Sequence, residues 1–246
     1  MSSGDIWLIT GASSGIGEAV VQAARASGAE VLALDVNDER GEALARATGA
    51  IYQHCDVSQV EDWHAVVHKL SELGAPTHVH LNAGIQIAPP SAPLSEYQFE
   101  AATLDRYRRM MGVNVDGVVL GLRALLPTLG NGAAIVVTAS LAGITPYSVD
   151  PLYAMSKHAV VGLVRSLGPT LAARGIRINA LCPGGIDTAI IPEAQRTRDA
   201  VFMSTASLAK EVLFLMKVEQ TGKSWAKVSE AKPVFIVRAP GDKEGR

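Results

Sequence analysis

Tyr153 and Lys157 could together carry out acid–base chemistry. They stand four positions apart in the segment YAMSK, so on a helix both side chains would lie on one face. A free phenol has a pKa of about 10 and is a poor base at neutral pH, but a neighbouring ammonium group favours the phenolate. The spacing therefore predicts a tyrosine that exchanges a proton with a hydroxyl group. Taken alone, the pair is equally consistent with two solvent-exposed side chains on a helix surface.

A glycine-rich segment near the start of the chain, TGASSGIG at residues 10–17, has the composition of a phosphate-binding turn. It joins a predicted strand to a predicted helix, whose amino terminus offers free N–H groups and a partial positive charge. Glycines let a pyrophosphate approach the backbone. The spacing departs from G-x-G-x-x-G, since Val20 stands at the last glycine position. The strand–turn–helix context favours a dinucleotide site over a turn that binds no ligand.

Asp35 ends the second predicted strand, 18 residues after Gly17. This is near the position where an acidic residue binds the adenosine ribose in dinucleotide-binding folds. A 2′-phosphate there would meet a like charge, at a cost of about 4 kcal/mol at intermediate dielectric. The sequence therefore predicts NAD rather than NADP as cofactor. The alternatives are a strand-end carboxylate without a ligand, or compensation of its charge by Arg40.

Short apolar segments alternate with longer amphipathic ones, which is typical of a parallel sheet covered by helices on both faces. With right-handed crossovers, this predicts a single-domain α/β protein with a doubly wound Rossmann fold. Ser58 and Glu61 form a capping-box pattern. We expect one domain over residues 1–246, with a substrate lid at about 189–216. The expected strands are 5–10, 30–35, 50–56, 77–84, 133–140 and 175–184, and the expected helices are 15–28, 38–49, 58–74, 104–126 and 152–173.

Composition and charge limit the partners and the compartment. The net charge of −2 gives no indication of a nucleic-acid or anionic membrane partner. No apolar run approaches the roughly 20 residues of a membrane span. Cys55 and Cys182 lack a CxxC or metal-type spacing, so we expect reduced thiols and no metal site. The amino terminus has no signal-peptide pattern, and we expect a cytoplasmic protein.

The sequence resembles the short-chain dehydrogenase/reductase family, in its NAD-preferring TGxxxGxG and YxxxK form, over about residues 6–188. Ser140 stands 13 residues before Tyr153, which is the family's spacing. The family's motifs occur in order, and they are TGASSGIG (10–17), CDV (55–57), NAG (82–84), VNVDG (113–117), YAMSK (153–157) and PGGIDT (183–188).

The resemblance implies a catalytic role for four residues. Tyr153 would take the proton of a secondary alcohol as hydride passes to the nicotinamide, or return it in the reverse direction. Lys157 would lower the pKa of Tyr153 and bind the nicotinamide ribose. Ser140 would hold the substrate oxygen, and Asn114 would hold a water molecule that links Lys157 to solvent.

The resemblance also implies the cofactor contacts. Asp56 would bond the adenine amino group, Val57 would line the adenine pocket, and Ile186 and Thr188 would contact the carboxamide. The implied NAD-binding residues are Gly11, Ser13, Ser14, Gly15, Ile16, Gly17, Asp35, Asp56, Val57, Asn82, Ala83, Gly84, Tyr153, Lys157, Pro183, Gly184, Ile186 and Thr188.

We expect a small-molecule substrate, a hydrophobic or alicyclic secondary alcohol or ketone, because the residues that follow these motifs are mostly apolar. Three alternatives stay open: a non-catalytic dinucleotide sensor, an epimerase or dehydratase of the extended type, and an NADPH-dependent carbonyl or acyl reductase. In the last case an acidic carrier could dock on the arginines 106, 108 and 109, although a solvated helix face is the better explanation of them. The expected pocket residues are 85–87, 141–144, 147 and 189–205.

The carboxyl-terminal segment, about 229–246, departs from the family pattern. It lacks the glycine-rich turn that often lies at subunit contacts in tetramers of the family. We expect a homo-oligomer, with a dimer favoured over a tetramer. PVFIV, residues 233–237, is expected to form an extra strand or to lie on a neighbouring subunit, and GDKEGR, residues 241–246, to be mobile.

Overall fold

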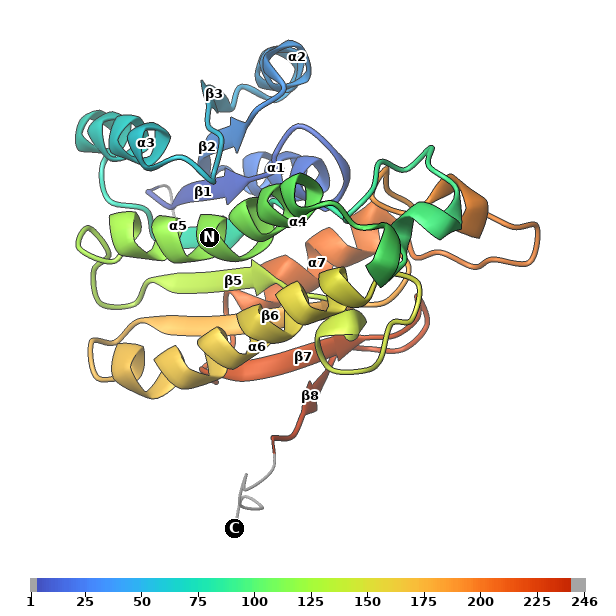
Figure 1. The fold of residues 1–246 in the computed structure, drawn as a ribbon. Coiled ribbons are helices and arrows are strands. Elements are labelled where there is room, and N and C mark those ends of the chain that lie inside the picture. The colour runs from blue at the N-terminus through green and yellow to red at the C-terminus, as the bar shows by residue number, and fades with distance from the viewer. Residues whose placement is uncertain (1–3, 240–246) are drawn as a thin grey trace.

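Eight strands of the described chain form one sheet, in the order β3-β2-β1-β4-β5-β6-β7-β8 (Figure 1). The computed structural model describes residues 4–239. The first seven strands are parallel, and β8 pairs with β7 in the antiparallel sense. The strands are β1 Ile6–Thr10, β2 Glu30–Asp35, β3 Ile51–His54, β4 His78–Leu81, β5 Ala134–Thr138, β6 Arg177–Pro183, β7 Lys223–Lys227 and β8 Phe235–Val237.

Helices cover both faces of this sheet (Figure 1). α1, α2 and α7 lie on one face, and α3, α5 and α6 lie on the other. The α-helices are α1 Gly15–Ala26, α2 Asp38–Thr48, α3 Val60–Leu73, α4 Leu104–Met111, α5 Gly117–Leu125, α6 Pro151–Ala172 and α7 Thr205–Leu215. A π-helical turn, Gly112–Asp116, joins α4 to α5, and short 3₁₀ turns occur at Leu94–Tyr97, Phe99–Ala101, Leu141–Gly143 and Glu193–Gln195.

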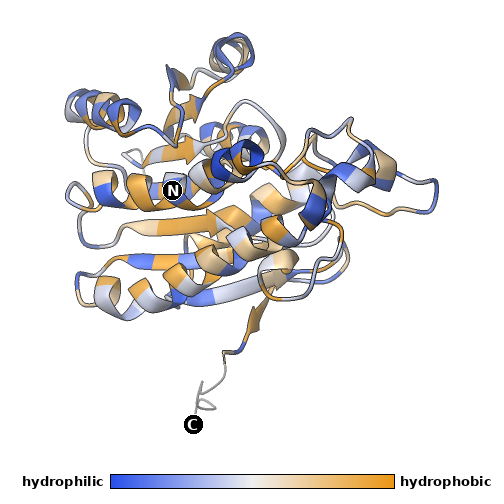
Figure 2. Ribbon diagram, in the orientation of Figure 1, coloured by the Kyte–Doolittle hydropathy of each residue, from blue (hydrophilic) through white to orange (hydrophobic). Residues whose placement is uncertain are grey.

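Each central strand contributes apolar side chains to both layers, which explains its nearly continuous apolar sequence. In β1, Leu8 packs on the α3–α5–α6 side, and Trp7 and Ile9 pack on the α1–α7 side. The central strand β5 is accordingly hydrophobic over nearly its whole length in Figure 2. The predicted doubly wound α/β fold is confirmed, and each of the six expected strands lies at its expected place.

The strand order reverses between β1 and β4, because the chain leaves β3 at one edge and re-enters the sheet beside β1. In open α/β sheets, the carboxyl ends of the strands at such a switch point form the ligand-binding crevice. The glycine-rich turn follows β1, and the NAG segment follows β4. The topology therefore places these two motifs side by side.

Two local expectations need correction. The predicted capping box at Ser58 and Glu61 is wrong, because α3 begins at Val60 and its N-cap residue is Gln59. The amide and the hydroxyl of Ser58 donate instead to the Asp56 carboxylate, at 2.9 and 2.7 Å. The expected helix 104–126 is continuous but contains the π-helical turn at residues 112–116. π-turns within α-helices are frequent at functional sites, and this one carries Asn114.

The expected lid, residues 189–216, includes the helix α7. Leu208 and Val212 of α7 are fully buried, and α7 packs against α1. Residues 189–204 remain outside the layers and project to the right in Figure 1. A bridge between Ile186 and Met203 brings the two sides of this segment together. We call residues 189–204 the lid segment, and its role as a lid stays a prediction.

The atypical carboxyl-terminal segment forms an edge strand and a brace. β8 pairs with β7, with Ile236 opposite Trp225, so the expected extra strand is confirmed. Between the two strands, Glu230 accepts hydrogen bonds from the amide and hydroxyl of Ser204, at 3.1 and 2.9 Å. This contact between Glu230 and Ser204 is the brace, and it fixes the end of the segment 189–204. The expectation for residues 241–246 lies outside the described residues.

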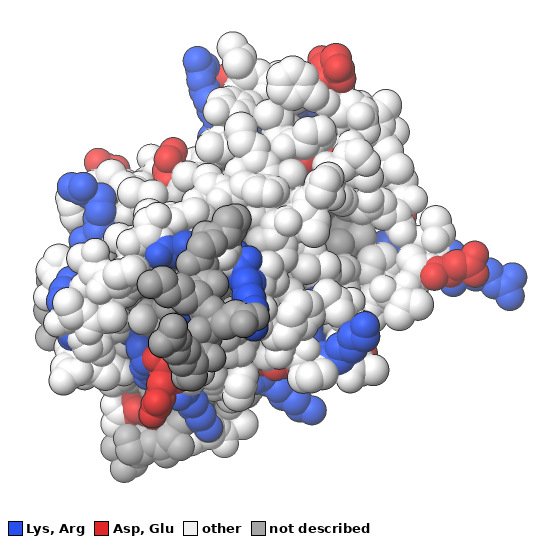
Figure 3. Space-filling view, turned by 90° about the horizontal axis from the view of Figure 1, so that it is seen from below, with Lys and Arg blue, Asp and Glu red and all other residues white. Residues whose placement is uncertain are grey.

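The surface seen from below carries both acidic and basic side chains (Figure 3). At the right of the same view, acidic and basic groups adjoin one another. Within residues 4–239, no helix combines the length and the apolar character that crossing a membrane would require.

Candidate active site

A cavity of about 1250 Å³ opens at the carboxyl ends of the parallel strands. It brings together residues from nearly every predicted motif. Three predicted site residues, Ser13, Gly17 and Asn114, do not line it and instead support residues that do. The predicted residues that line the cavity are Gly11, Ser14, Gly15, Ile16, Asp35, Asp56, Val57, Asn82, Ala83, Gly84, Ser140, Tyr153, Lys157, Pro183, Gly184, Ile186 and Thr188.

The glycine-rich turn is tight because side chains have no space in it. Gly11 and Gly15 adopt φ of +61° and +58°, which other residues rarely tolerate. A Cβ on Gly11 would lie 2.9 Å from the Cα of Ala83. A Cβ on Gly17 would overlap the carbonyl group of Gly11. Within the described chain, the Ser14 side chain makes no cap on α1, so the first N–H groups of α1 remain to bind an anion.

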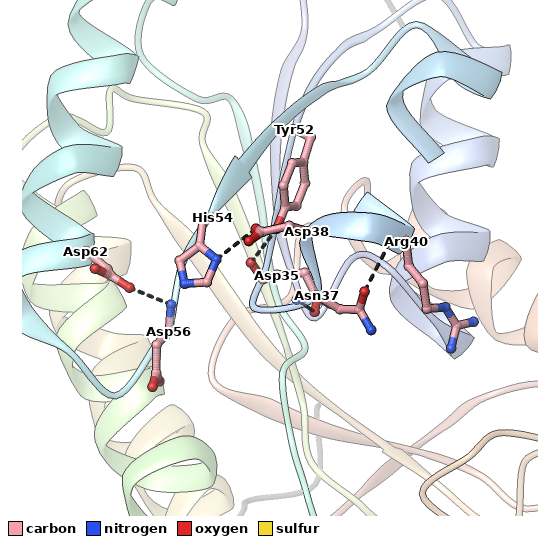
Figure 4. Close-up of polar contacts among 8 residues, drawn as sticks. All are labelled: Asp35, Asn37, Asp38, Arg40, Tyr52, His54, Asp56 and Asp62. Atoms are coloured by element: carbon pink, nitrogen blue, oxygen red, sulfur yellow. Dashed lines mark hydrogen bonds and ion pairs between the residues drawn. The ribbon is translucent and has the colours of Figure 1, made fainter. Parts of the chain in front are cut away.

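Asp35 is held in place at the far end of the cavity. Its carboxylate accepts hydrogen bonds from the backbone amides of Ser13 and Asn37, at 2.9 and 3.0 Å. Asn37 also caps α2 by accepting from the amide of Arg40, at 3.1 Å. Figure 4 shows the guanidinium of Arg40 directed away from Asp35. The cation that could have offset the charge of Asp35 therefore does not face it.

Asp38, Tyr52 and His54 form a polar cluster beside Asp35 that the sequence did not indicate (Figure 4). Asp38 accepts a hydrogen bond from the Tyr52 hydroxyl at 2.7 Å and pairs with the His54 Nδ1 at 2.8 Å. The Tyr52 hydroxyl also lies 2.9 Å from the main-chain oxygen of Asp35. The hydrogen bond to Asp38 raises the pKa of His54. This cluster fixes the loop between β2 and α2.

Asp56 lies at the turn after β3 and is held from both sides. Its Oδ1 accepts from Ser58, and its amide donates to the Asp62 carboxylate at 2.7 Å. Figure 4 shows the Asp56 carboxylate on the side away from His54.

Tyr153 and Lys157 are buried on α6, and not exposed as the alternative interpretation required. Tyr153 is 8% exposed and Lys157 is 2% exposed. The Lys157 Nζ lies 5.6 Å from the centroid of the Tyr153 ring and donates to the main-chain oxygen of Thr138 at 3.0 Å. Asp150 caps the helix by accepting from the Tyr153 amide at 2.8 Å, and it also accepts from the Ile87 amide at 2.9 Å.

In the protein by itself, burial is the largest cause of the pKa shifts of Tyr153 and Lys157. It raises the pKa of the Tyr153 phenol above its usual range, although a hydrogen bond with Ser140 opposes the shift. It lowers the pKa of Lys157 to about 8. Burial therefore has the largest effect on Tyr153 in the protein by itself, and a lowering of its pKa by Lys157 stays a prediction. A further positive charge is needed to favour the phenolate.

Asn114 connects the loop after β4 to α6. Its Oδ1 accepts from the Ile85 amide at 2.8 Å, and its Nδ2 donates to the Ile85 carbonyl at 2.8 Å and to the Ser156 hydroxyl at 3.0 Å. A Cβ on Gly84 would lie 3.2 Å from the Lys157 Nζ and 3.4 Å from the Asn114 Oδ1. The absence of that side chain leaves a space that borders both polar groups.

A buried chain of hydrogen bonds, missed by the sequence analysis, supports the glycine turn. The Asn82 Nδ2 donates to the carbonyl of Gly11 at 3.3 Å, so its Oδ1 must accept from the Thr138 hydroxyl at 3.0 Å. Thr138 has a single hydroxyl proton, so the His80 Nε2, at 2.8 Å, must be the donor to it. His80 is completely buried, and burial lowers its pKa to about 3. The available signal was the presence of histidine in β4, whose sequence is HVHL.

The residues present fit a nicotinamide dinucleotide. The α1 amino terminus can bind a diphosphate, and Asp35 can bind a ribose. Beside the glycine turn, where a Cβ on Gly15 would lie 3.0 Å from the Thr188 Cγ2, the buried Thr188 hydroxyl has no hydrogen-bond partner among the described residues, so a polar group of the ligand would satisfy it. Tyr153, Lys157 and Ser140, the residues expected to be catalytic, line the same cavity.

Comparison with known proteins agrees with this geometry. A family model described as short chain dehydrogenase matches residues 5–199. The 2,5-dichloro-2,5-cyclohexadiene-1,4-diol dehydrogenase of Sphingobium indicum is 39% identical over 203 residues, which cover 80% of this chain and 77% of the relative. The (+)-borneol dehydrogenase 2 of Salvia officinalis is 32% identical over 211 residues, which cover 80% and 71%. The solved 3-ketoacyl-(acyl-carrier-protein) reductase from Brucella melitensis, complexed with NADH, superposes with a TM-score of 0.82, 27% identity and coverage of 92% and 97%.

Proposed function

Because this chain belongs to the short-chain dehydrogenase family and is an oxidoreductase acting on alcohol groups, we propose that it transfers hydride between an alicyclic secondary alcohol and NAD. The observation that carries the proposal is the position of Tyr153, Ser140 and Lys157 in the same cavity as the glycine turn and Asp35. The relatives named for a cyclohexadiene-diol and for borneol support an alicyclic substrate.

NAD is favoured over NADP by the charge at the adenosine end. The Asp35 carboxylate is fixed by two backbone amides, and Arg40 is directed away from it. A 2′-phosphate at about 4 Å from this carboxylate would cost about 4 kcal/mol at an effective dielectric of about 20. The cofactor would be held by the motif residues that line the cavity, with Ser13 and Gly17 supporting the turn, Asp56 contacting the adenine and Thr188 the carboxamide.

Side chains of the protein itself carry out the proton transfer. When bound, the cofactor supplies the hydride acceptor and, in its oxidised form, a positive charge that favours the phenolate. Tyr153 takes the proton from the substrate hydroxyl, and Ser140, which hydrogen-bonds with Tyr153, positions the substrate oxygen. Lys157 adds its own charge 5.6 Å from the ring centroid. The space at Gly84 between Lys157 and Asn114 suits a water molecule that returns protons to solvent.

We further propose that the enzyme works in the cytoplasm as a homo-oligomer. Both cysteines are buried free thiols, which suits a reducing compartment. Leu104 on α4 and Met155 on α6 are large apolar side chains that are 68% and 42% exposed. Apolar side chains exposed on these helices support a subunit contact there.

The test measures NADH formation by absorbance, with NAD or NADP, over a panel of alicyclic, aliphatic and sugar secondary alcohols. We expect turnover of alicyclic alcohols with NAD, and its loss in Tyr153→Phe without loss of NAD binding. NAD binding without turnover of any secondary alcohol would contradict the proposed reaction. Turnover of polar sugars alone would contradict the proposed substrate class.

A further inference from the structure

Three polar side chains stand in the part of the cavity that is otherwise walled by apolar groups. Gln86 follows β4, Tyr147 follows β5, and Gln195 belongs to the lid segment, and all three line the cavity. The surrounding buried cluster contains Ile87, Ala142 and the ring of Tyr153 itself. Polar groups placed in this way orient a mostly apolar ligand.

The Gln86 amide has an acceptor that nothing in the described chain uses. Gln86 is 8% exposed, and its Nε2 donates to the Ile190 carbonyl at 2.8 Å. A carbonyl oxygen can only accept, so this bond determines which end of the amide is nitrogen. The Oε1 is buried without a hydrogen-bond partner among the described residues. An unpaired buried acceptor is unfavourable, and a ligand donor would satisfy it.

Tyr147 places a second polar group, its hydroxyl, beside Tyr153. This hydroxyl donates to the Gln195 Oε1 at 3.1 Å and also hydrogen-bonds with the Gln86 side chain. Its ring meets the Tyr153 ring edge to face, with the centroids 6.1 Å apart. The Tyr147 hydroxyl is therefore placed to contact a substrate whose reacting oxygen is at Tyr153.

The chemistry of this position selects a neutral hydrogen-bond donor. The Gln86 Oε1 can only accept, so a substrate carbonyl would not satisfy it, whereas the single proton of a substrate hydroxyl would, and the Tyr147 hydroxyl can hydrogen-bond to the oxygen of the same group. Two of the arginines near this position are already paired: Arg196 with Asp187 at 2.7 Å, and Arg106 with Glu96 at 2.7 Å. A carboxylate or phosphate on the substrate would therefore find no unpaired partner in these two arginines.

We infer that the substrate is an alicyclic diol, and that Tyr147 and Gln86 bind the hydroxyl group that does not react. This inference rests on the proposed function, because the position of the second hydroxyl is defined relative to a first one oxidised at Tyr153. Tyr147 and Gln86 would then distinguish a diol from a monoalcohol of the same shape.

The experiment compares kcat/KM with NAD for the cis and trans isomers of cyclohexane-1,2-, 1,3- and 1,4-diol and for the matching methylcyclohexanols. A methyl group replaces the second hydroxyl at nearly the same size. We expect at least one diol to exceed its methyl counterpart by about tenfold or more, because a site built for a hydroxyl discriminates against analogues that lack it. In Tyr147→Phe and in Gln86→Met, the ratio of kcat/KM for the diol to that for its methyl counterpart should fall toward one, chiefly because the KM for the diol rises.

Tyr97→Phe is the matched control. Tyr97 is fully buried, and its hydroxyl donates to the Pro89 carbonyl at 2.7 Å, outside the cavity lining. It loses the same atom as Tyr147→Phe, so its ratio of diol to methylcyclohexanol should equal that of the wild type.

Three results would overturn the inference. Equal kcat/KM for every diol and its methyl counterpart would do so while leaving the proposed function intact. A ratio that is unchanged in both Tyr147→Phe and Gln86→Met, or that falls equally in Tyr97→Phe, would assign the preference to other causes. Failure of the wild type to oxidise any of these alcohols or borneol would instead contradict the proposed function, and this inference with it.

Discussion

The ammonium nitrogen of Lys157 donates a hydrogen bond to the main-chain oxygen of Thr138, 3.0 Å away. The side chain of the same threonine donates to Asn82, which in turn holds the carbonyl of Gly11. The last residue of β5 thus connects the proposed proton-transfer pair to the cofactor turn. A change at this point is expected to affect both cofactor binding and catalysis.

Replacement of Lys157 by methionine should move the pH dependence of alcohol oxidation. The ammonium 5.6 Å from the Tyr153 ring favours the phenolate, so its loss should shift the rising limb of kcat/KM upward by about one pH unit or more. The measurement is a pH profile of NADH formation. Lys210→Met, on the exposed face of α7, is the control. An unshifted profile would show that Lys157 does not act on the phenol.

The charge on Asp35 should determine the choice of cofactor. In Asp35→Asn, the ratio of kcat/KM with NADP to that with NAD should rise by about 100-fold, because the repulsion of a 2′-phosphate is removed. Asp38→Asn removes the same charge nearby, but Asp38 bonds to Tyr52 and His54. In Asp38→Asn, the ratio of kcat/KM with NADP to that with NAD should change by less than about fivefold. Similar changes in both variants would mean that overall charge, and not Asp35, decides the preference.

Burial of His80 should make the protein less stable in acid. Burial lowers its pKa to about 3, whereas an unfolded histidine titrates at about 6.5. Between these values only the unfolded chain binds the proton, so the free energy of unfolding should fall by up to about 1.4 kcal/mol per pH unit as the pH decreases. His80→Gln can keep the hydrogen bond to Thr138 without titrating. Urea unfolding should show a shallower pH dependence in this variant.

His54 provides a control of opposite sign. Its pKa is raised by Asp38, so its stabilising contribution is present below about pH 6.5 and is lost as the pH rises through the folded pKa. His54→Gln should therefore lose stability mainly at acidic pH. If His80→Gln and His54→Gln change the pH dependence in the same direction, the assignment for His80 is wrong.

The ion pair between Lys227 and Glu211 should hold the carboxyl-terminal segment on the sheet. The two groups are 2.7 Å apart, and their side chains are 4% and 17% exposed. Glu211→Gln should lower the free energy of unfolding by about 3 kcal/mol, since it leaves a buried ammonium without its counter-charge. Glu230→Gln, at the exposed contact with Ser204, should cost much less. Equal small effects in chemical denaturation would contradict a structural role for the pair.

Local features of the site were predictable because they depend on residues close together in the sequence. The turn at residues 10–17 needs only a strand before it, a helix after it and glycines at the tight positions. Tyr153 and Lys157 share a face because a helix repeats every 3.6 residues. The apolar strands implied a sheet buried on both faces, and hence the parallel α/β fold.

Other features depend on contacts between distant segments. His80 and Thr138 are 58 residues apart, and no local pattern links them. The same holds for the packing of α7 against α1 and for the π-helical turn, where Asn114 bonds to Ile85 and Ser156. The Ser58–Asp56 turn is local, and its hydrogen bonds took the place of the expected capping box.

The sequence by itself determined the fold class, the order of the motifs and the identity of the proposed acid–base pair, since these follow from side-chain type and from periodicity. Only the tertiary structure decided how deeply Tyr153 and Lys157 are buried and which groups surround them. Burial is a property of the whole packed chain, and it controls the pKa of both residues and the hydrogen-bonding groups left for a substrate.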